Sequence, residues 1–216
     1  MLTPEILAAV KSYTANMQRK VAFVLQTGEH SKRPELVEFL QALAATSENL
    51  SFEERDSEGQ LRSAVSFALE VDGEANGVEF SGIPGGHEFN SLILAILHSS
   101  GTAPKLDSQV KQIVEAVKEP LSFEVFISLS CHNCPDIVQT LNQFAILNPL
   151  IKSEMIDGGL YPALIEERNI QGVPSVYLNG DLFANGKIDT AQLVSKLTER
   201  YPDLTERAAA TEQLPL

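Results

Sequence analysis

The stretch LSFEVFISLSCHNCP, residues 121–135, contains the pattern that decides the fold. Over residues 121–128 apolar side chains occupy every second position, and the segment is rich in β-branched and aromatic residues, which predicts a β-strand. After Pro135 the spacing becomes that of an amphipathic helix, which we expect to run from about Cys131 to Leu147. The apolar stripe of this helix consists of Ile137, Val138, Leu141, Phe144 and Ala145.

Both cysteines of the chain lie at this junction, in the motif Cys131-His132-Asn133-Cys134. Two residues three apart in a helical turn share one face, so their sulfurs can form and break a disulfide without unfolding the chain. At the start of the helix, Cys131 would face unpaired backbone N–H groups and the positive dipole end, which favour a thiolate. We therefore predict that Cys131 is the attacking thiol and that Cys134, one turn deeper, resolves the mixed disulfide.

Three other roles for a cysteine pair fit the residues less well. A c-type haem requires a histidine directly after Cys134, where this chain has Pro135. A static disulfide across one helical turn restrains the unfolded chain little and is more typical of secreted proteins, but it stays open as an alternative. A zinc site needs about four ligands, so with two cysteines it would have to recruit two of four histidines that lack paired ligand spacing. No metal is predicted; the histidines are His30, His87, His98 and His132.

Charge and hydropathy limit the partners that this chain can have. Its 216 residues include 16 lysines and arginines against 29 acidic residues, which gives a formal charge of −13. This balance argues against nucleic acid or an anionic membrane surface as a partner. No apolar stretch approaches 18 residues and the N-terminus lacks the pattern of a signal peptide, so we expect a cytoplasmic protein. In a reducing cytoplasm, a close cysteine pair is more often catalytic than structural.

The order of predicted elements repeats with a period near one hundred residues, which indicates two copies of one α/β fold. We expect the first copy at residues 1–101, the second at 102–201, and a linker or tail at 202–216. In the first copy a turn over residues 28–32 takes the place of the cysteine motif, so only the second copy keeps the thiols. Strands are predicted in the first copy at 21–25, 50–54, 64–71 and 78–80, and in the second at 121–128, 151–156 and 173–178.

A second motif follows the cysteines by 43 residues, where Val173-Pro174 opens a predicted strand. Asn179-Gly180 ends that strand, and this dipeptide is typical of a type I′ hairpin turn. A proline can begin a strand where its missing N–H is not needed. Pro174 is therefore either an ordinary strand-entry residue or, because it accompanies a CxxC motif, part of the site.

These motifs together resemble the thioredoxin and glutaredoxin superfamily. The resemblance implies two contiguous thioredoxin-like folds with mixed central sheets flanked by helices, of which only the second has a CxxC. It also implies that Pro174 is cis and faces the disulfide, and that the backbone of Val173 pairs with an extended segment of the partner protein.

The segments SLSCHNCPD, GHEFNSL and IDGGLYPALIEERNIQGVPSVYLNG are similar, more closely, to the N-terminal domain of the flavoprotein subunit of bacterial alkyl hydroperoxide reductase. In that family electrons pass from NADH through FAD and a second dithiol in the flavoprotein core to this domain, and then to a peroxiredoxin. The chain contains no GxGxxG motif, so we expect it to bind neither FAD nor NADH. Both would belong to domains that follow Leu216 in the family.

Two further residues are candidates for the site. Glu88 opens a predicted helix of the first copy, where it is either a buried carboxylate that shuttles protons for thiol exchange or a first-turn acid stabilised by the helix dipole. The resemblance favours the first role, because an acid at this position approaches the active-site cysteines in the family. His132 either tunes the Cys131 thiolate or is simply a residue at the helix N-terminus.

The sequence therefore predicts a dithiol electron carrier between a flavoprotein dithiol and a peroxiredoxin. A general protein disulfide oxidoreductase or isomerase is the first alternative. The second is a peptide-binding module in which the cysteines have no role.

Overall fold

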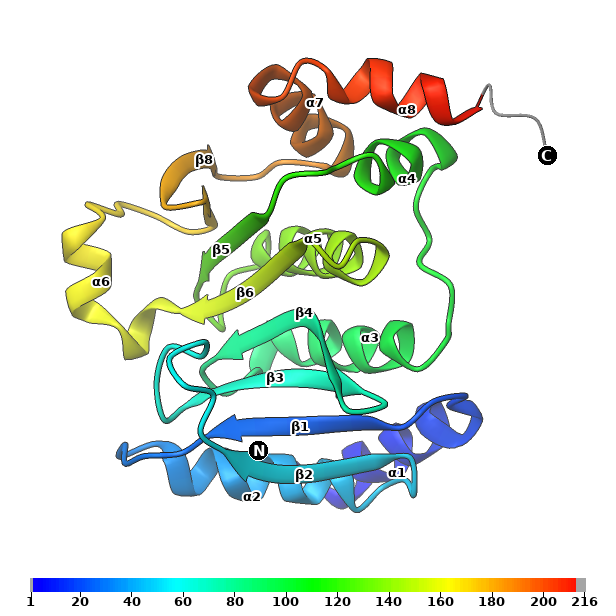
Figure 1. Cartoon of the computed structure of the whole chain (residues 1–216). Helices are drawn as coiled ribbons and strands as arrows, with labels where there is room; N and C mark the ends of the chain where they lie inside the picture. Colours follow the sequence, from blue (N-terminus) through cyan, green and yellow to red (C-terminus); the bar gives the residue numbers. More distant parts are fainter. Residues whose placement is uncertain (1, 213–216) are drawn as a thin grey trace.

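The computed structural model describes residues 2–212, and its centre is one eight-stranded mixed sheet (Figure 1). The strands lie in the order β2-β1-β3-β4-β6-β5-β7-β8. The first four strands by number come from the first half of the chain and the last four from the second. Their bounds are β1 Val21–Gln26, β2 Leu50–Arg55, β3 Ser66–Val71, β4 Glu74–Ser81, β5 Leu121–Ile127, β6 Ile151–Asp157, β7 Ser175–Leu178 and β8 Asp181–Asn185.

Helices flank the sheet. Three of them begin after a residue whose side chain caps that end: Thr3 accepts a hydrogen bond from the Ile6 N–H, Asp107 accepts one from the Gln109 N–H, and Asp189 forms a capping box with Gln192. The bounds are α1 Pro4–Tyr13, α2 Arg33–Ala44, α3 Phe89–Ser99, α4 Ser108–Glu115, α5 Cys134–Leu147, α6 Pro162–Glu167, α7 Thr190–Arg200 and α8 Leu204–Glu212, with short 3₁₀ turns η1 Thr14–Asn16, η2 Gly86–Glu88 and η3 Gly158–Leu160.

The two halves join edge to edge, because β4 of the first half pairs with β6 of the second in parallel. Their register runs from Val78 opposite Ser153 to Ser81 opposite Ile156. The predicted fold class, mixed sheets flanked by helices with a CxxC only in the second half, is confirmed. The two sheets are in addition continuous, which the sequence pattern does not reveal.

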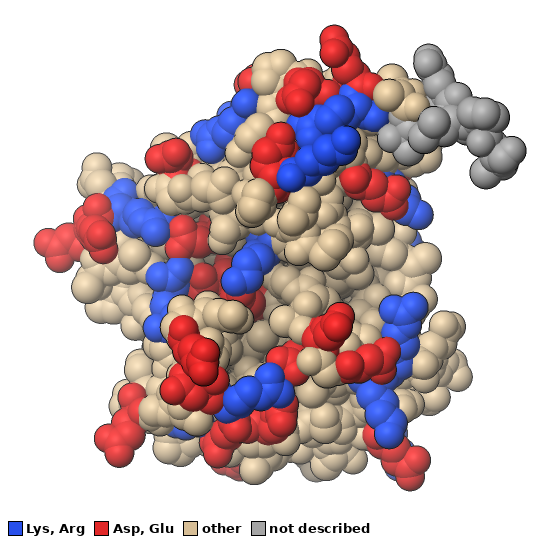
Figure 2. Space-filling view, viewed as in Figure 1, with Lys and Arg blue, Asp and Glu red and all other residues tan. Residues whose placement is uncertain are grey.

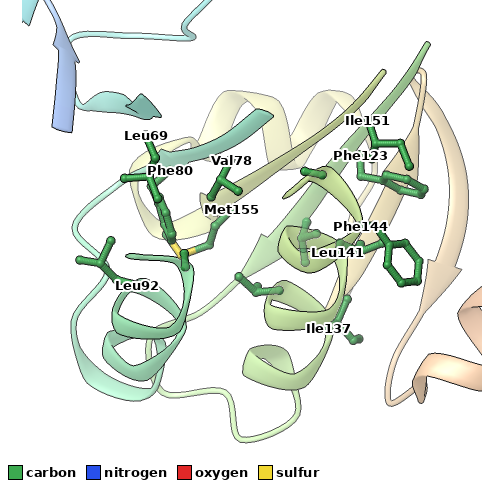
Figure 3. Packing of buried hydrophobic residues seen from close by; sticks show 14 of the residues in the cluster. Leu69, Val78, Phe80, Leu92, Phe123, Ile137, Leu141, Phe144, Ile151 and Met155 are labelled. Atoms are coloured by element: carbon green, nitrogen blue, oxygen red, sulfur yellow. The ribbon is translucent and has the colours of Figure 1, made fainter. Parts of the chain in front are cut away.

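One hydrophobic core crosses the boundary expected at residues 101 and 102. Helices α3 and α5 lie side by side against the sheet and contact each other (Figure 1). Side chains of the first half pack there against side chains of the second half, as Figure 3 shows. The labelled residues of the first half are Leu69, Val78, Phe80 and Leu92; those of the second are Phe123, Ile137, Leu141, Phe144, Ile151 and Met155.

The chain after residue 201 corrects one expectation. Instead of a linker, helix α8 packs against α4, with Leu204 and Ala208 buried. Arg207 secures it by donating to the carbonyl oxygen of Ala116 at 3.2 Å and to Glu119 at 2.9 Å. The apolar stripe of α8 is short and consists partly of alanine, so the sequence does not mark it as a packed helix. The rest of the expected tail, residues 213–216, lies outside the described residues.

The other face of the sheet carries a charge network across the junction. Glu79, Glu154 and Glu124 lie in one row on the neighbouring strands β4, β6 and β5. Arg62, from the segment between β2 and β3, donates to Glu154 at 2.8 Å and to Glu124 at 2.5 Å. Lys152 lies 3.1 Å from Glu79. Figure 2 shows basic and acidic side chains interspersed over this view of the molecule.

Arg62 therefore holds together carboxylates that would otherwise repel each other at the junction. We predict that Arg62→Met lowers the free energy of unfolding at pH 7 by about 2 kcal/mol, because partly buried carboxylates lose their counterion. Urea unfolding monitored by circular dichroism measures this, with Arg19→Met at an exposed arginine as the control. Equal stability of both variants at pH 7 would contradict the prediction.

Candidate active site

Cys131 and Cys134 form a disulfide between the end of β5 and the start of α5, with their Cα atoms 5.6 Å apart. The helix starts at Cys134 and not at Cys131, which corrects the expected boundary. Cys131 instead lies in a turn in which its N–H donates to the carbonyl oxygen of Ser128 at 3.0 Å. Pro135, at the second helical position, suits a helix that begins at Cys134 because its missing N–H would have no partner there.

The two sulfurs differ in their access to a partner protein. Cys131 is half-buried, whereas Cys134 is completely buried. A nucleophile must reach the disulfide of another protein, and a resolving thiol needs to reach only its neighbour. The burial supports the predicted roles of attacking Cys131 and resolving Cys134.

The structure brings the second predicted motif to the cysteines. The carbonyl oxygen of Val173 lies 3.9 Å from Sγ of Cys131. The bond between Val173 and Pro174 is cis, as the resemblance implies. Gly186 N–H donates to the carbonyl oxygen of Pro174 at 2.9 Å, which attaches this segment to the end of β8. Partner binding by Val173 stays a prediction.

Glu88 is fully buried in the turn η2 that leads into α3. Its Oε1 accepts a hydrogen bond from the Ser91 hydroxyl at 3.0 Å, while Oε2 has no hydrogen-bond partner. Burial raises the pKa of this carboxyl to about 7, although the Ser91 hydrogen bond acts in the opposite direction. A carboxyl of this kind is half-protonated near neutral pH, as proton transfer requires. Its catalytic role stays a prediction.

The turn η2 lies directly against the cysteine turn. The N–H of His87 donates to the carbonyl oxygen of Leu129 at 3.0 Å. Gly86 has a φ of 54°, and a Cβ at this position would come within 2.7 Å of the same oxygen, so only glycine allows this contact. The rings of His87 and His132, both exposed, are 4.3 Å apart.

Sequence reasoning missed the roles of Gly86 and His87 in this contact. The run Gly85-Gly86 ahead of a helix was the available signal for a close backbone approach. His132 is placed beside the disulfide, but its ring meets His87 of the other half. Its effect on the thiolate stays a prediction.

Neither a metal centre nor a membrane helix is visible within residues 2–212. No three side chains among its histidines, cysteines, aspartates and glutamates are grouped so that they could hold a metal ion. In the same part of the chain, no helix has the length and apolar character needed to cross a bilayer.

Comparison with known proteins agrees with a thioredoxin-like fold that contains the cysteine pair. A family model described as thioredoxin domain matches residues 121–199. The F subunit of alkyl hydroperoxide reductase (AhpF) of Staphylococcus aureus is 41% identical over 91% of this chain and 38% of its own length. The N-terminal domain of AhpF of Enterococcus faecalis superposes with a TM-score of 0.84, at 26% identity, over 91% of this chain and 100% of that one.

The chain is similar to the N-terminal domain of AhpF. It spans about two fifths of the length of the curated relatives it matches. One of these is a Bacillus subtilis protein named NADH dehydrogenase, which is 39% identical over 91% of this chain and 38% of its own length. A protein disulfide oxidoreductase of Aeropyrum pernix shares the fold at a TM-score of 0.80 and 19% identity, covering 100% of this chain and 97% of that one.

The similarity to AhpF, the thioredoxin-domain match and the CxxC pair together support thiol–disulfide oxidoreductase activity for this chain. The disulfide is formed by the CxxC in the half that matches the thioredoxin domain, so the fold and the reactive group coincide. The other half lacks cysteines but supplies η2 and Glu88.

The difference in burial predicts a difference in thiol reactivity. When the disulfide is reduced, iodoacetamide should alkylate Cys131 at least roughly tenfold faster than Cys134, because Cys134 is inaccessible. Mass spectrometry of quenched time points measures both rates in one sample. Faster modification of Cys134 would reverse the assigned roles.

The raised pKa of Glu88 predicts how stability depends on pH. Its usual pKa is 4.5 and its folded value is about 7, so the folded protein keeps a proton that the unfolded chain has released between these values. The free energy of unfolding of the wild type, compared with that of Glu88→Gln, is therefore highest below pH 4.5. It falls by about 3 kcal/mol relative to the variant as the pH rises to 7.

Urea unfolding of the oxidised proteins at pH 4.5, 6 and 7.5 measures the stability difference between wild type and variant. Glu5→Gln, at an exposed glutamate of α1, is the control and should show no such trend. A constant difference between wild type and Glu88→Gln would contradict the raised pKa.

Proposed function

We propose that this chain carries two electrons from a flavoprotein dithiol to the disulfide of a peroxiredoxin. The observation that carries the proposal is the accessible Cys131 and buried Cys134 in a domain similar to that of AhpF. A flavoprotein core would receive its electrons from NADH through FAD, and both cofactors would be bound by parts of that protein beyond this chain. Relatives of this chain are named for alkyl hydroperoxide reductase and for NADH dehydrogenase, which agrees with this direction of electron flow.

The reaction is two successive thiol–disulfide exchanges. The Cys131 thiolate attacks one sulfur of the peroxiredoxin disulfide, that bond breaks, and the second peroxiredoxin sulfur leaves as a thiolate. The Cys134 thiol then loses its proton, and its thiolate attacks Sγ of Cys131. This step forms the Cys131–Cys134 disulfide and releases the other peroxiredoxin sulfur. The chain has lost two electrons, and the partner has gained them.

Val173 and Glu88 would assist the two exchanges in different ways. Val173, half-buried beside Cys131, would pair through its backbone with an extended segment of the partner. Glu88 is a buried carboxyl in the turn that contacts the cysteine turn, and it would accept the proton of Cys134 as a general base. In the return direction, its carboxylic acid would give that proton back.

The test is direct electron transfer from the reduced protein. After reduction and removal of the reductant, mixing with a bacterial 2-Cys peroxiredoxin and peroxide should oxidise both cysteines about 100-fold faster than mixing with insulin, a specificity that corresponds to about 2.7 kcal/mol. Cys134→Ser should trap a mixed disulfide through Cys131, and Cys131→Ser should be inactive.

Two outcomes would overturn the proposal. Equal rates with insulin and with the peroxiredoxin would favour a general disulfide oxidoreductase. Peroxiredoxin binding that is unchanged when both cysteines are replaced by serine, without electron transfer in the wild type, would favour a peptide-binding module.

A further inference from the structure

A hydrogen-bonded chain connects the two halves of the molecule beside the disulfide. Gln139 of α5 donates through Nε2 to the hydroxyl of Ser91 on α3 at 3.1 Å. Ser91 donates in turn to Oε1 of Glu88 at 3.0 Å. The helix that contains Cys134 is thus linked through two polar side chains to the buried acid of the other half.

The topology places Glu88 and Cys134 at the same end of two neighbouring helices. Strands β4, β6 and β5 are parallel, so α3 and α5, which follow β4 and β5, start at the same edge of the sheet and run in the same direction (Figure 1). Glu88 directly precedes α3, and Cys134 is the first residue of α5. The turn η2 with Glu88 contacts α5, so acid and buried sulfur lie at the same end of neighbouring helices.

These hydrogen bonds involve only one of the two carboxyl oxygens of Glu88. Oε1 is bound to Ser91, whereas the fully buried Oε2 has no partner. A buried carboxylate oxygen without a partner is costly, and such an atom in a native structure calls for an explanation. A proton on Oε2, exchanged with the neighbouring thiol, explains it.

We propose that Ser91 and Gln139 are positioning residues that hold the Glu88 carboxyl with Oε1 bound and Oε2 free to exchange a proton with Cys134. This rests on the proposed acid and base role of Glu88 and adds the residues that orient it. When an external thiolate attacks Cys131, the Sγ–Sγ bond breaks and its electron pair passes to Cys134. The Glu88 acid then donates its proton to that sulfur, and solvent returns a proton to the carboxylate.

The hydrogen bonds also set the pH range in which Glu88 is an acid. The Ser91 hydroxyl stabilises the charged form and lowers the pKa of Glu88, against the larger effect of burial. Gln139, by donating to the same hydroxyl, orients it and polarises its O–H bond. The titratable side chains on η2, α3 and α5, besides Glu88 itself, are His87, His98, Asp136 and Cys134. Cys131 and His132 lie in the cysteine turn, and the pocket beside Gly85 and Gly86 is lined by Lys32, Glu35, Glu38 and Asp157.

The experiment compares variants of the three hydrogen-bonded residues with a matched control. Ser91→Ala removes the donor to Glu88, Gln139→Met removes the donor to Ser91 at nearly constant volume, and Glu88→Gln removes the acid. Gln143→Met, one turn further along α5, changes the same residue type at a side chain that donates to the backbone carbonyl oxygen of Gln139 and not to Ser91 or Glu88. Two quantities are followed from pH 5 to 9: the carboxyl ¹³C resonance of Glu88, and the rate of disulfide reduction by dithiothreitol per unit of its thiolate.

In the wild type, the reduction rate should fall above a midpoint that coincides with the Glu88 titration. In Ser91→Ala both midpoints should rise together by about one pH unit, because a carboxylate loses a hydrogen bond. Gln139→Met should raise both by a smaller amount, Gln143→Met should leave both unchanged, and Glu88→Gln should lose the fall in rate. A rate midpoint that stays in place while the carboxyl midpoint moves, or an equal shift in Gln143→Met, would overturn the positioning role.

Dithiothreitol makes this result independent of the physiological partner. Failure of electron transfer to a peroxiredoxin, with the pH shifts intact, would reject the proposed electron acceptor and leave the positioning role supported. Normal transfer without the shifts would reject the positioning role alone.

Discussion

The parallel pairing of β4 with β6 is the interaction on which the rest of the structure depends. It turns two small sheets into one and places α3 beside α5, so that a single core fills the space between the halves. It also puts η2 against the cysteine turn, where Gly86 allows the backbones to approach closely. The half without cysteines therefore contacts the cysteine turn, and it contains the buried carboxyl that we propose as the acid of the redox site.

Burying that acid has an energetic cost that the junction must offset. A carboxyl whose pKa is raised to about 7 destabilises the folded protein at neutral pH, because folding then opposes its ionisation. The apolar contacts of the shared core and the Arg62 network on the opposite face both act across the same junction. Groups with strongly perturbed pKa values cluster at functional sites, which agrees with the position of Glu88 in a turn that contacts the cysteine turn.

The sequence predicted what depends on local patterns. Alternating apolar residues located the strands, helical spacing located most helices, and the CxxC followed by Pro174 located the site. The predicted first residue of α5 was wrong, because Cys131, His132 and Asn133 precede the helix, which begins at Cys134. The edges that join were not predictable, because alternation identifies the buried face of a strand but not its neighbour. Arg62 meets Glu154 across 92 positions of sequence, a distance at which residue patterns carry no information.

Redox-induced infrared difference spectroscopy tests most directly whether the two halves form one site. The disulfide is reduced in the intact protein at pH 7, and the carboxyl region is compared between the oxidised and reduced forms. The account predicts a protonated-carboxyl band that changes on reduction and is absent from Glu88→Gln. A spectrum without any carboxyl change, or one that is identical in Glu88→Gln, would mean that the acid of one half does not respond to the disulfide of the other.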